Sequence, residues 1–151
     1  MEPMNFSRLP LEVVLVLNVL WFGAGAIYFG LTAVSAAKLL VPRFARTSPL
    51  FKTVSASLPF LGGMNLVLSV LSGVLLFDPT IFPLDRQVSV LAAVLALAHG
   101  TQFAANVPVA RAGHGRGDAP WPVLRGPMLF IFLMDFTLML ANGGIAVSMR
   151  H

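Results

Sequence analysis

The stretch LEVVLVLNVLWFGAGAIYFGLTAV, from Leu11 to Val34, decides the class of fold. Its one charged residue, Glu12, lies at the beginning, and the rest is almost entirely aliphatic, aromatic or small. About 20 mostly apolar residues form a helix long enough to cross the hydrocarbon core of a bilayer. The tripeptide Ala24-Gly25-Ala26 resembles a signal-peptidase site, but the apolar run continues past it, which favours a retained membrane span.

Three further stretches of the chain have the same apolar character. They run over about 53–77, 88–110 and 126–149, and short segments rich in proline and glycine separate them. No stretch shows the alternation of apolar and polar residues that is typical of barrel strands. We therefore predict an all-α, polytopic membrane protein in which residues 1–151 form a single domain. This domain is a bundle of four transmembrane helices over about 11–34, 53–77, 88–110 and 126–149.

The composition of the chain excludes most soluble classes of protein. Of its 151 residues, 57% are hydrophobic and 11% are charged, whereas about 25% of the residues of ordinary soluble domains are charged. The high hydrophobicity also excludes an intrinsically disordered chain. Because the sequence has no cysteine, disulfide scaffolds, zinc ribbons, iron–sulfur proteins and thiol-based redox enzymes are excluded as well.

The basic residues are distributed unevenly between the predicted loops. Seven of the ten lie in the first and third loops: Lys38, Arg43, Arg46, Lys52, Arg111, Arg116 and Arg125. Cytoplasmic loops of membrane proteins carry an excess of Lys and Arg, so both termini are predicted to be non-cytoplasmic. The net charge of +4 then reflects topology and attraction to the lipid bilayer, and it does not indicate binding to nucleic acid.

One carboxylate lies in the middle of a predicted span. Asp135 is surrounded by the apolar sequence LFIFLMDFTLML, whereas the other five acidic residues lie in tails, in loops or at the mouth of a span: Glu2, Glu12, Asp78, Asp85 and Asp118. At about 1.5 Å of rise per residue, His99 and Asn65 fall at the depth of Asp135, near the bilayer midplane. Asn18 and Trp21 fall somewhat closer to the non-cytoplasmic side. Polar residues at this depth are costly, so each is a candidate for function.

Each predicted helix carries its polar and small residues on one face. At about 100° per residue, the following groups share a face of the first, second, third and fourth helix: Asn18, Trp21 and Gly25; Asn65, Ser69 and Ser72; His99, Gln102 and Asn106; Asp135 and Asn142. Such faces are expected to point into the bundle, with aliphatic surfaces towards lipid. Small residues also predict close helix packing at Gly62-Gly63, at Gly143-Gly144 and in the series Ala92, Ala96, Gly100 and Ala104.

Asp135 and His99 allow two interpretations. An ionised carboxylate in hydrocarbon must be paired or neutralised, and His99 on the neighbouring helix is the candidate partner, with Asn65 or Gln102 as hydrogen-bond donors. In the structural interpretation, the two side chains only hold helices together. In the functional interpretation, they share a proton and act as an acid–base or ligand-binding pair. Two ligands are too few for a metal site, so none is predicted, and the sequence does not name a cofactor.

Residues near the ends of the helices also allow two interpretations. Arg111 and Arg125 are either positive-inside charges or a clamp for an anion or a lipid headgroup at the mouth of a cavity. The sequence Asn106-Val107-Pro108 is expected to end the third helix, or Asn106 orients a ligand in a vestibule on the cytoplasmic side. Pro59 is expected to kink the second helix. Trp121 is interpreted as an anchor at the membrane interface.

Two stretches resemble known families of small bacterial membrane proteins. The run HGTQFAANVPVARAG (His99 to Gly113) is similar to the Asn-Val-Pro segment of anthrone-oxygenase-like membrane proteins, and WFGAGAIYFGL (Trp21 to Leu31) resembles the first helix of DoxX-like proteins. The first resemblance implies binding or cofactor-independent oxidation of a lipophilic aromatic molecule at the bacterial inner membrane. The arginine-rich start of the fourth helix in that family is matched here by Arg125 alone.

The four-helix glutathione-transferase-like membrane family shares the length and topology of this chain. Its asparagine-plus-glutamate pair on the second helix is represented here by Asn65 alone, so glutathione chemistry is not predicted.

The sequence leaves three functional hypotheses. The first is a midplane polar pocket that binds a small lipophilic molecule. If the protein is an enzyme, this pocket also transforms the bound molecule. There Asp135 and His99 are the catalytic pair, and the ligand-binding residues are Asn18, Trp21, Asn65, Gln102, Asn106, Arg125 and Asn142. The second is a proton- or cation-coupled transporter, or a channel-like homo-oligomer. The third is a non-catalytic membrane partner subunit in which the polar residues only join helices. The sequence does not decide whether the protein is an enzyme.

Overall fold

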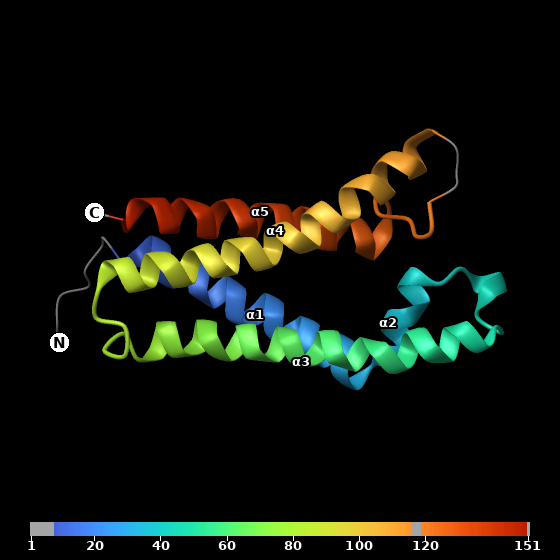
Figure 1. Cartoon of the computed structure of the whole chain (residues 1–151), viewed down its shortest axis with the longest axis horizontal. Coiled ribbons are helices and arrows are strands. Elements are labelled where there is room, and N and C mark those ends of the chain that lie inside the picture. Colours follow the sequence, from blue (N-terminus) through green and yellow to red (C-terminus); the bar gives the residue numbers. More distant parts are fainter. Residues whose placement is uncertain (1–7, 116–118, 151) are drawn as a thin grey trace.

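The structure is a computed structural model that describes residues 8–115 and 119–150 of the chain. This part forms helices and no strand: α1 (Leu9–Leu31), α2 (Ala33–Leu40), the 3-10 helix η1 (Arg43–Ala45), α3 (Pro49–Phe77), α4 (Asp85–Gly115) and α5 (Gly126–Ser148) (Figure 1). The four helices α1, α3, α4 and α5 are long and apolar enough to cross a membrane, which confirms the predicted fold class. Three charged residues named above lie outside the described part: Glu2, Arg116 and Asp118.

The first predicted span is divided at Thr32. α1 ends one residue earlier, and the separate short helix α2 begins one residue later. The Thr32 hydroxyl donates a hydrogen bond of 2.8 Å to the carbonyl oxygen of Tyr28, and such a bond competes with the helical backbone pattern. In α2, Ala36 and Ala37 are buried in a cluster with Leu58 of α3. The sequence places this segment partly in the span and partly in the first loop, and the structure corrects that prediction.

α3 begins four residues before the start predicted for the second span. The Ser48 hydroxyl caps the helix by accepting a hydrogen bond of 3.3 Å from the backbone N–H of Leu50. Pro49 occupies the first helical position, where the missing N–H costs nothing. Pro59 lies in the interior of α3, which nevertheless stays one helix as far as Phe77.

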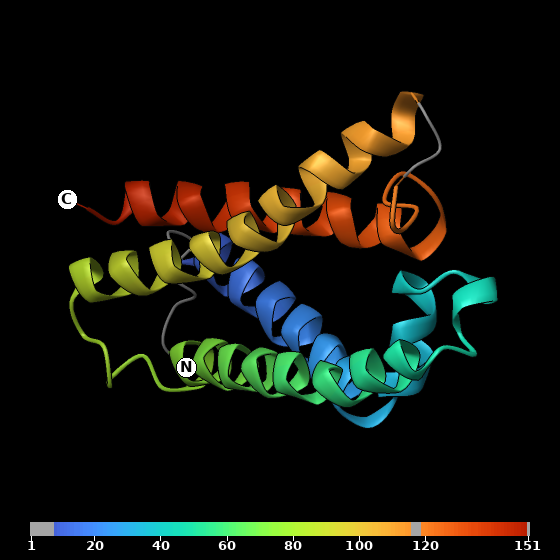
Figure 2. The ribbon, with the colours of Figure 1, turned by 45° about the vertical axis from the view of Figure 1, so that its right-hand side comes forward.

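α4 does not end at Asn106-Val107-Pro108, so that prediction was wrong. The helix continues to Gly115 with Pro108 in its interior. Proline removes one backbone hydrogen bond, but neighbouring groups would gain nothing by leaving the helix, because a bilayer offers no water to receive them. The C-terminal part of α4 leans away from the axis of its N-terminal part in both views (Figures 1 and 2). The helix therefore bends in the region of the proline instead of ending there.

The four long helices form two pairs. α1 packs along α3, with α2 against one end of α3, and α4 packs along α5 (Figures 1 and 2). The pairs meet where α1 crosses to contact α5. This crossing is the place at which the polar faces of different helices can reach one another.

Glycine permits the close approach of α1 and α3. A Cβ atom added to Gly62 would lie 2.5 Å from the backbone nitrogen of Gly30 and 2.6 Å from its Cα, which confirms the close packing predicted at Gly62. A Cβ atom on Gly63, Gly143 or Gly144 would meet no other described segment within 4 Å. The prediction of close packing was therefore wrong for these three positions.

Both basic loops lie at the same end of the bundle, opposite the start of α1 and the end of α5 (Figure 1). We name it the basic end, and its described cations are Lys38, Arg43, Arg46, Lys52, Arg111 and Arg125. The outward surfaces of the helices are apolar: Phe60 is 80% exposed and Phe130 is 60% exposed. Such side chains are suited to contact with lipid and not with water.

Candidate functional site

The crossing of the two helix pairs brings together five side chains that we name the polar cluster: Asn18, Trp21, His99, Asp135 and Asn142. Asn18 and Trp21 come from α1, His99 comes from α4, and the other two come from α5. His99 and Asp135 are fully buried, and Asn18 and Asn142 are at most 1% exposed. The cluster therefore joins three helices in a region that water does not reach.

His99 and Asp135 form the predicted pair. The Nδ1 atom of His99 lies 3.0 Å from Oδ1 of Asp135. The indole N–H of Trp21 donates a second hydrogen bond of 3.1 Å to the same Oδ1 atom. The other carboxylate oxygen, Oδ2, is the one buried side-chain nitrogen or oxygen among the described residues that has no hydrogen-bond partner. All donors thus converge on one side of the carboxylate.

Asn18 and Asn142 form a reciprocal amide pair next to the histidine. Asn18 donates to Asn142 Oδ1 at 2.8 Å, and Asn142 donates to Asn18 Oδ1 at 3.1 Å. Each amide nitrogen also donates to a carbonyl of its own helix, at 2.9 Å to Val14 and at 2.8 Å to Leu138. Turning either amide over would place its oxygen against a carbonyl oxygen, so the orientation of both amides is determined.

The amide pair determines where the protons of His99 lie. The Nε2 atom of His99 is 2.9 Å from Asn18 Oδ1, an acceptor, so Nε2 must donate. One further proton lies between Nδ1 and Asp135 Oδ1, either on an imidazolium or on a carboxylic acid. In both forms the His99–Asp135 pair has no net charge, which limits the cost of burying it.

Apolar packing holds the imidazole ring in this orientation. The ring of Phe22 stacks on His99 with a centroid distance of 4.5 Å and an interplanar angle of 21°. Phe22 is fully buried, as is Leu95, one turn before His99 on α4. The ring therefore cannot turn without displacing the core between the helix pairs.

Other residues predicted for the site lie outside the polar cluster. Asn65 is buried on α3, donates at 2.8 Å to the carbonyl of Leu61, and packs against Gly25. Gln102 lies half-buried one turn beyond His99. The polar face of α3 that carries Asn65 therefore points towards α1 and not towards His99.

Asn106 joins a different contact, at the basic end. It accepts a hydrogen bond of 3.0 Å from the indole N–H of Trp121 and donates one of 3.0 Å to the carbonyl of Gln102. Trp121 thus ties the segment before α5 to α4, a role that its interpretation as a membrane anchor missed. No periodic pattern marks it, because the contact joins a helix to a loop.

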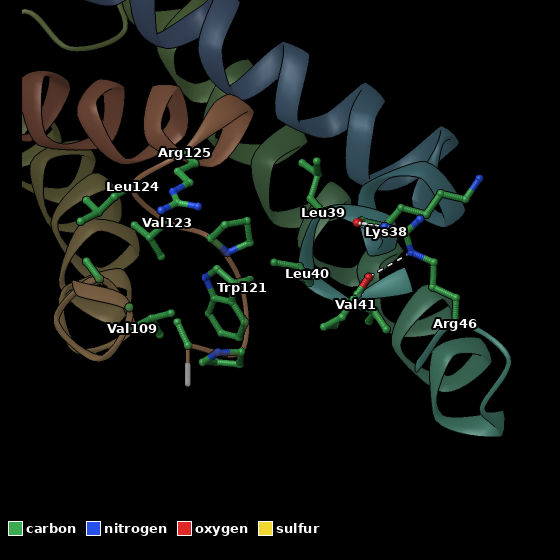
Figure 3. Close-up of a pocket in the computed structure, with 16 residues that line it drawn as sticks. Lys38, Leu39, Leu40, Val41, Arg46, Val109, Trp121, Val123, Leu124 and Arg125 are labelled. Carbon is green, nitrogen blue, oxygen red and sulfur yellow. Dashed lines mark hydrogen bonds between the residues drawn. The ribbon is translucent and has the colours of Figure 1, made fainter. Parts of the chain in front are cut away.

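A large cavity lies at the basic end, between the helix pairs (Figure 3). We name this cavity, of about 830 Å³, the basic groove. Its lining comes from the end of α2 and the segment after it, from α4, and from residues 119–125, and it includes Lys38, Arg46 and Arg125. Two cavities of about 510 and 490 Å³ and one of about 30 Å³ lie elsewhere. None of the four is lined by a residue of the polar cluster.

Comparisons with protein-family models, with curated proteins and with solved structures give no match for this chain. The resemblances to the anthrone-oxygenase-like and DoxX-like families therefore stay predictions.

Proposed function

We propose that this multi-pass membrane protein binds a small lipophilic molecule that donates a hydrogen bond to Oδ2 of Asp135. The observation that carries the proposal is the unpartnered state of this buried oxygen. An unmade hydrogen bond in an apolar interior costs about 1–3 kcal/mol, and more for a charged group. A ligand hydroxyl or amine would recover this cost, whereas the Oδ1 atom already accepts from Trp21 and faces His99.

The shared proton supports an acid–base role for the pair. With the proton on His99, the Asp135 carboxylate is ionised and its Oδ2 can accept a proton from the hydroxyl of a bound ligand. The imidazolium then balances the negative charge that remains on the ligand oxygen. The proton returns by the reverse step, so the pair would serve as general base and general acid in turn.

The arrangement of the helix pairs supports a route to the site. The pairs meet mainly where α1 crosses α5, whereas the contacts within each pair are extensive. Trp21, the donor to Asp135, is only half-buried at this crossing. Arg125, at the basic groove, precedes Asp135 by ten residues, or about 15 Å along α5. We expect a ligand to reach Oδ2 of Asp135 when the two helix pairs separate at the contact between α1 and α5.

A matched pair of probes tests the proposal on the purified full chain in detergent. 2-Naphthol can donate a hydrogen bond, whereas 2-methoxynaphthalene has a similar shape and cannot. At ten times its dissociation constant, 2-naphthol should raise the unfolding temperature by about 3–6 °C, and the ether should not. Asp135→Asn keeps an acceptor for Trp21 but places an N–H₂ group where Oδ2 was, so it should abolish the response. Asp85→Asn, at the exposed start of α4, is the control.

Two outcomes would overturn the proposal: an equal response to the ether, or an undiminished response of Asp135→Asn. Either would favour the second candidate function, a non-catalytic membrane subunit in which the polar cluster joins helices. The burial of Asn18, His99, Asp135 and Asn142 and the absence of cluster residues from the lining of the four cavities favour that candidate. In that case His99→Ala and Asp135→Ala should lower the free energy of unfolding by similar amounts.

We also propose that the basic end faces the cytoplasm, so that both termini are on the opposite side. The support is the position of both basic loops at one end of the bundle (Figure 1). Cytoplasmic loops are the ones enriched in Lys and Arg. The same asymmetry fits insertion into a bacterial inner membrane.

A further inference from the structure

The basic groove combines a large volume with walls from both helix pairs. Its volume of about 830 Å³ lies within the range of about 300–1,000 Å³ that is usual for small-molecule sites. One wall is the end of α2 and the segment after it, and the other is the segment that Trp121 ties to α4 (Figure 3). The groove therefore lies between the pairs and is not a depression in a single helix surface.

Most of the lining is apolar. It contains Leu39, Leu40 and Val41 on one side and Val109, Val123 and Leu124 on the other. Figure 3 shows Leu40 and the ring of Trp121 on opposite sides of the open space. Such walls suit the glycerol and acyl portions of a lipid better than they suit a free, hydrated ion.

The charged residues in the described part of the lining all have the same sign. They are Lys38, Arg46 and Arg125, and no Asp or Glu of residues 8–115 and 119–150 lines the groove. Figure 3 shows the end of the Lys38 side chain directed away from Trp121, which leaves the two arginines as the cations of the groove. They lie on opposite walls, Arg46 beside α2 and Arg125 beside Val123.

Arg46 is held in place for binding. Its Nε atom donates to the carbonyl of Val41 at 3.0 Å, and its Nη2 atom donates to the carbonyl of Lys38 at 2.7 Å. A guanidinium has five N–H donors, so these two bonds leave three that they do not use. Because the group is already ordered, an anion that binds these donors pays little of the usual entropy of fixing an arginine side chain.

We propose that the basic groove binds an anionic phospholipid, whose headgroup is attracted by Arg46 and Arg125 on the two walls and whose glycerol and chains follow the apolar lining. Basic pockets between membrane helices are suited to anionic lipid headgroups. The site uses no residue of the polar cluster, so it stands or falls independently of Asp135.

Lipid titration of the purified full chain in a neutral detergent tests this proposal. Phosphatidylglycerol should raise the unfolding temperature, and phosphatidylcholine at the same concentration should not. Arg125→Gln should raise the half-saturating concentration of phosphatidylglycerol about tenfold, because a charge-assisted contact is lost. Arg46→Gln would also remove the two hydrogen bonds at the end of α2. Arg46→Lys is therefore the second variant, and we expect it to raise the half-saturating concentration of phosphatidylglycerol less than Arg125→Gln does. The double variant Arg86→Gln and Arg150→Gln, at the cavity of about 510 Å³, is the control and should bind as the original chain does.

Several results would overturn the lipid site. Equal stabilisation by phosphatidylcholine would show that headgroup charge is irrelevant. If the control double variant weakened the binding of phosphatidylglycerol equally, the lipid would be attracted to surface cations in general and not to this groove. If inorganic phosphate alone gave the full stabilisation, the ligand would be a free phosphate and not a lipid. Unchanged binding to Arg125→Gln and Arg46→Lys would remove both arginines from the site.

Discussion

Asn18 is the residue on which the polar cluster depends most. Its oxygen accepts from His99 and Asn142, and its nitrogen donates to Asn142 and to its own helix. An amide can do this because it presents a donor and an acceptor on one short, rigid group. Through these bonds Asn18 decides which nitrogen of His99 carries the proton that is not shared with Asp135. It is therefore a positioning residue for the pair.

We expect Asn18→Ala to destabilise the chain by about 1–2 kcal/mol, because Nε2 of His99 and the amide of Asn142 lose their partners. Asn65→Ala is the matched control: it removes another buried amide, whose hydrogen bond goes to its own helix. Unfolding of both variants by increasing denaturing detergent measures the difference. Equal destabilisation of the two variants would contradict the special role of Asn18.

At the scale of the helix, the contact between α1 and α3 is determined by backbone contact. Gly62 and Gly30 approach so closely that a side chain at position 62 would overlap the backbone of α1. The hydroxyl of Ser69 donates to the carbonyl of Val19 across the same interface at 3.0 Å. In the other pair, the Ser89 hydroxyl donates to the carbonyl of Ala146 at 2.6 Å. Small side chains and interhelical hydrogen bonds drive the association of helices in lipid. Apolar side chains contribute little, because moving them from lipid into a helix interface gains little free energy.

Gly62→Ala should destabilise the chain by about 1–3 kcal/mol, because the added methyl group must push α1 and α3 apart. Gly63→Ala is the control on the next residue, where the methyl group meets open space. It should be neutral or stabilise α3 by up to about 1 kcal/mol, since alanine favours helix. Free energies of unfolding measure both effects. A Gly62→Ala variant as stable as Gly63→Ala would show that the helices are not in backbone contact.

At the scale of the whole molecule, the two helix pairs are joined by the polar cluster and by an apolar cluster of Leu15, Phe22, Leu75 and Leu95. The pairs are tightly packed internally, meet where α1 crosses α5, and leave the basic groove between them at the basic end. The hydrogen bonds of the polar cluster are directional, so they specify how the two helix pairs are rotated relative to each other. The polar cluster also places the one intramembrane acid of the described chain at the junction.

The absence of cysteine from the sequence makes the proposed topology directly testable. Thr47→Cys lies at the exposed basic end, and Thr80→Cys lies in the exposed loop between α3 and α4. In intact cells, a membrane-impermeant maleimide should label Thr80→Cys and not Thr47→Cys, because the basic loops are cytoplasmic. In inside-out vesicles the pattern should reverse. Labelling of Thr47→Cys alone in intact cells would show the opposite orientation.

The comparison of predicted and observed helices separates local from non-local causes. The four apolar helices and the pairing of His99 with Asp135 could be predicted, because hydropathy and rise per residue are properties of each helix alone. The break at Thr32 and the continuation of α4 past Pro108 could not. The break and the continuation both depend on whether the backbone groups that lose their helical hydrogen bonds find other partners. The neighbouring sequence does not show which partners are available.

The sequence by itself determined that this is an all-α protein with four apolar spans and one mid-span carboxylate, because burial in lipid selects composition directly. The tertiary structure decided which polar faces meet. Asn18 and Asn142 join His99 and Asp135, whereas Asn65, at the same predicted depth, faces Gly25. The physical reason is that helix pairing follows from how closely two backbones approach, as at Gly62 and Gly30. That approach rotates the polar face of α3 away from the site, and no single helix encodes it.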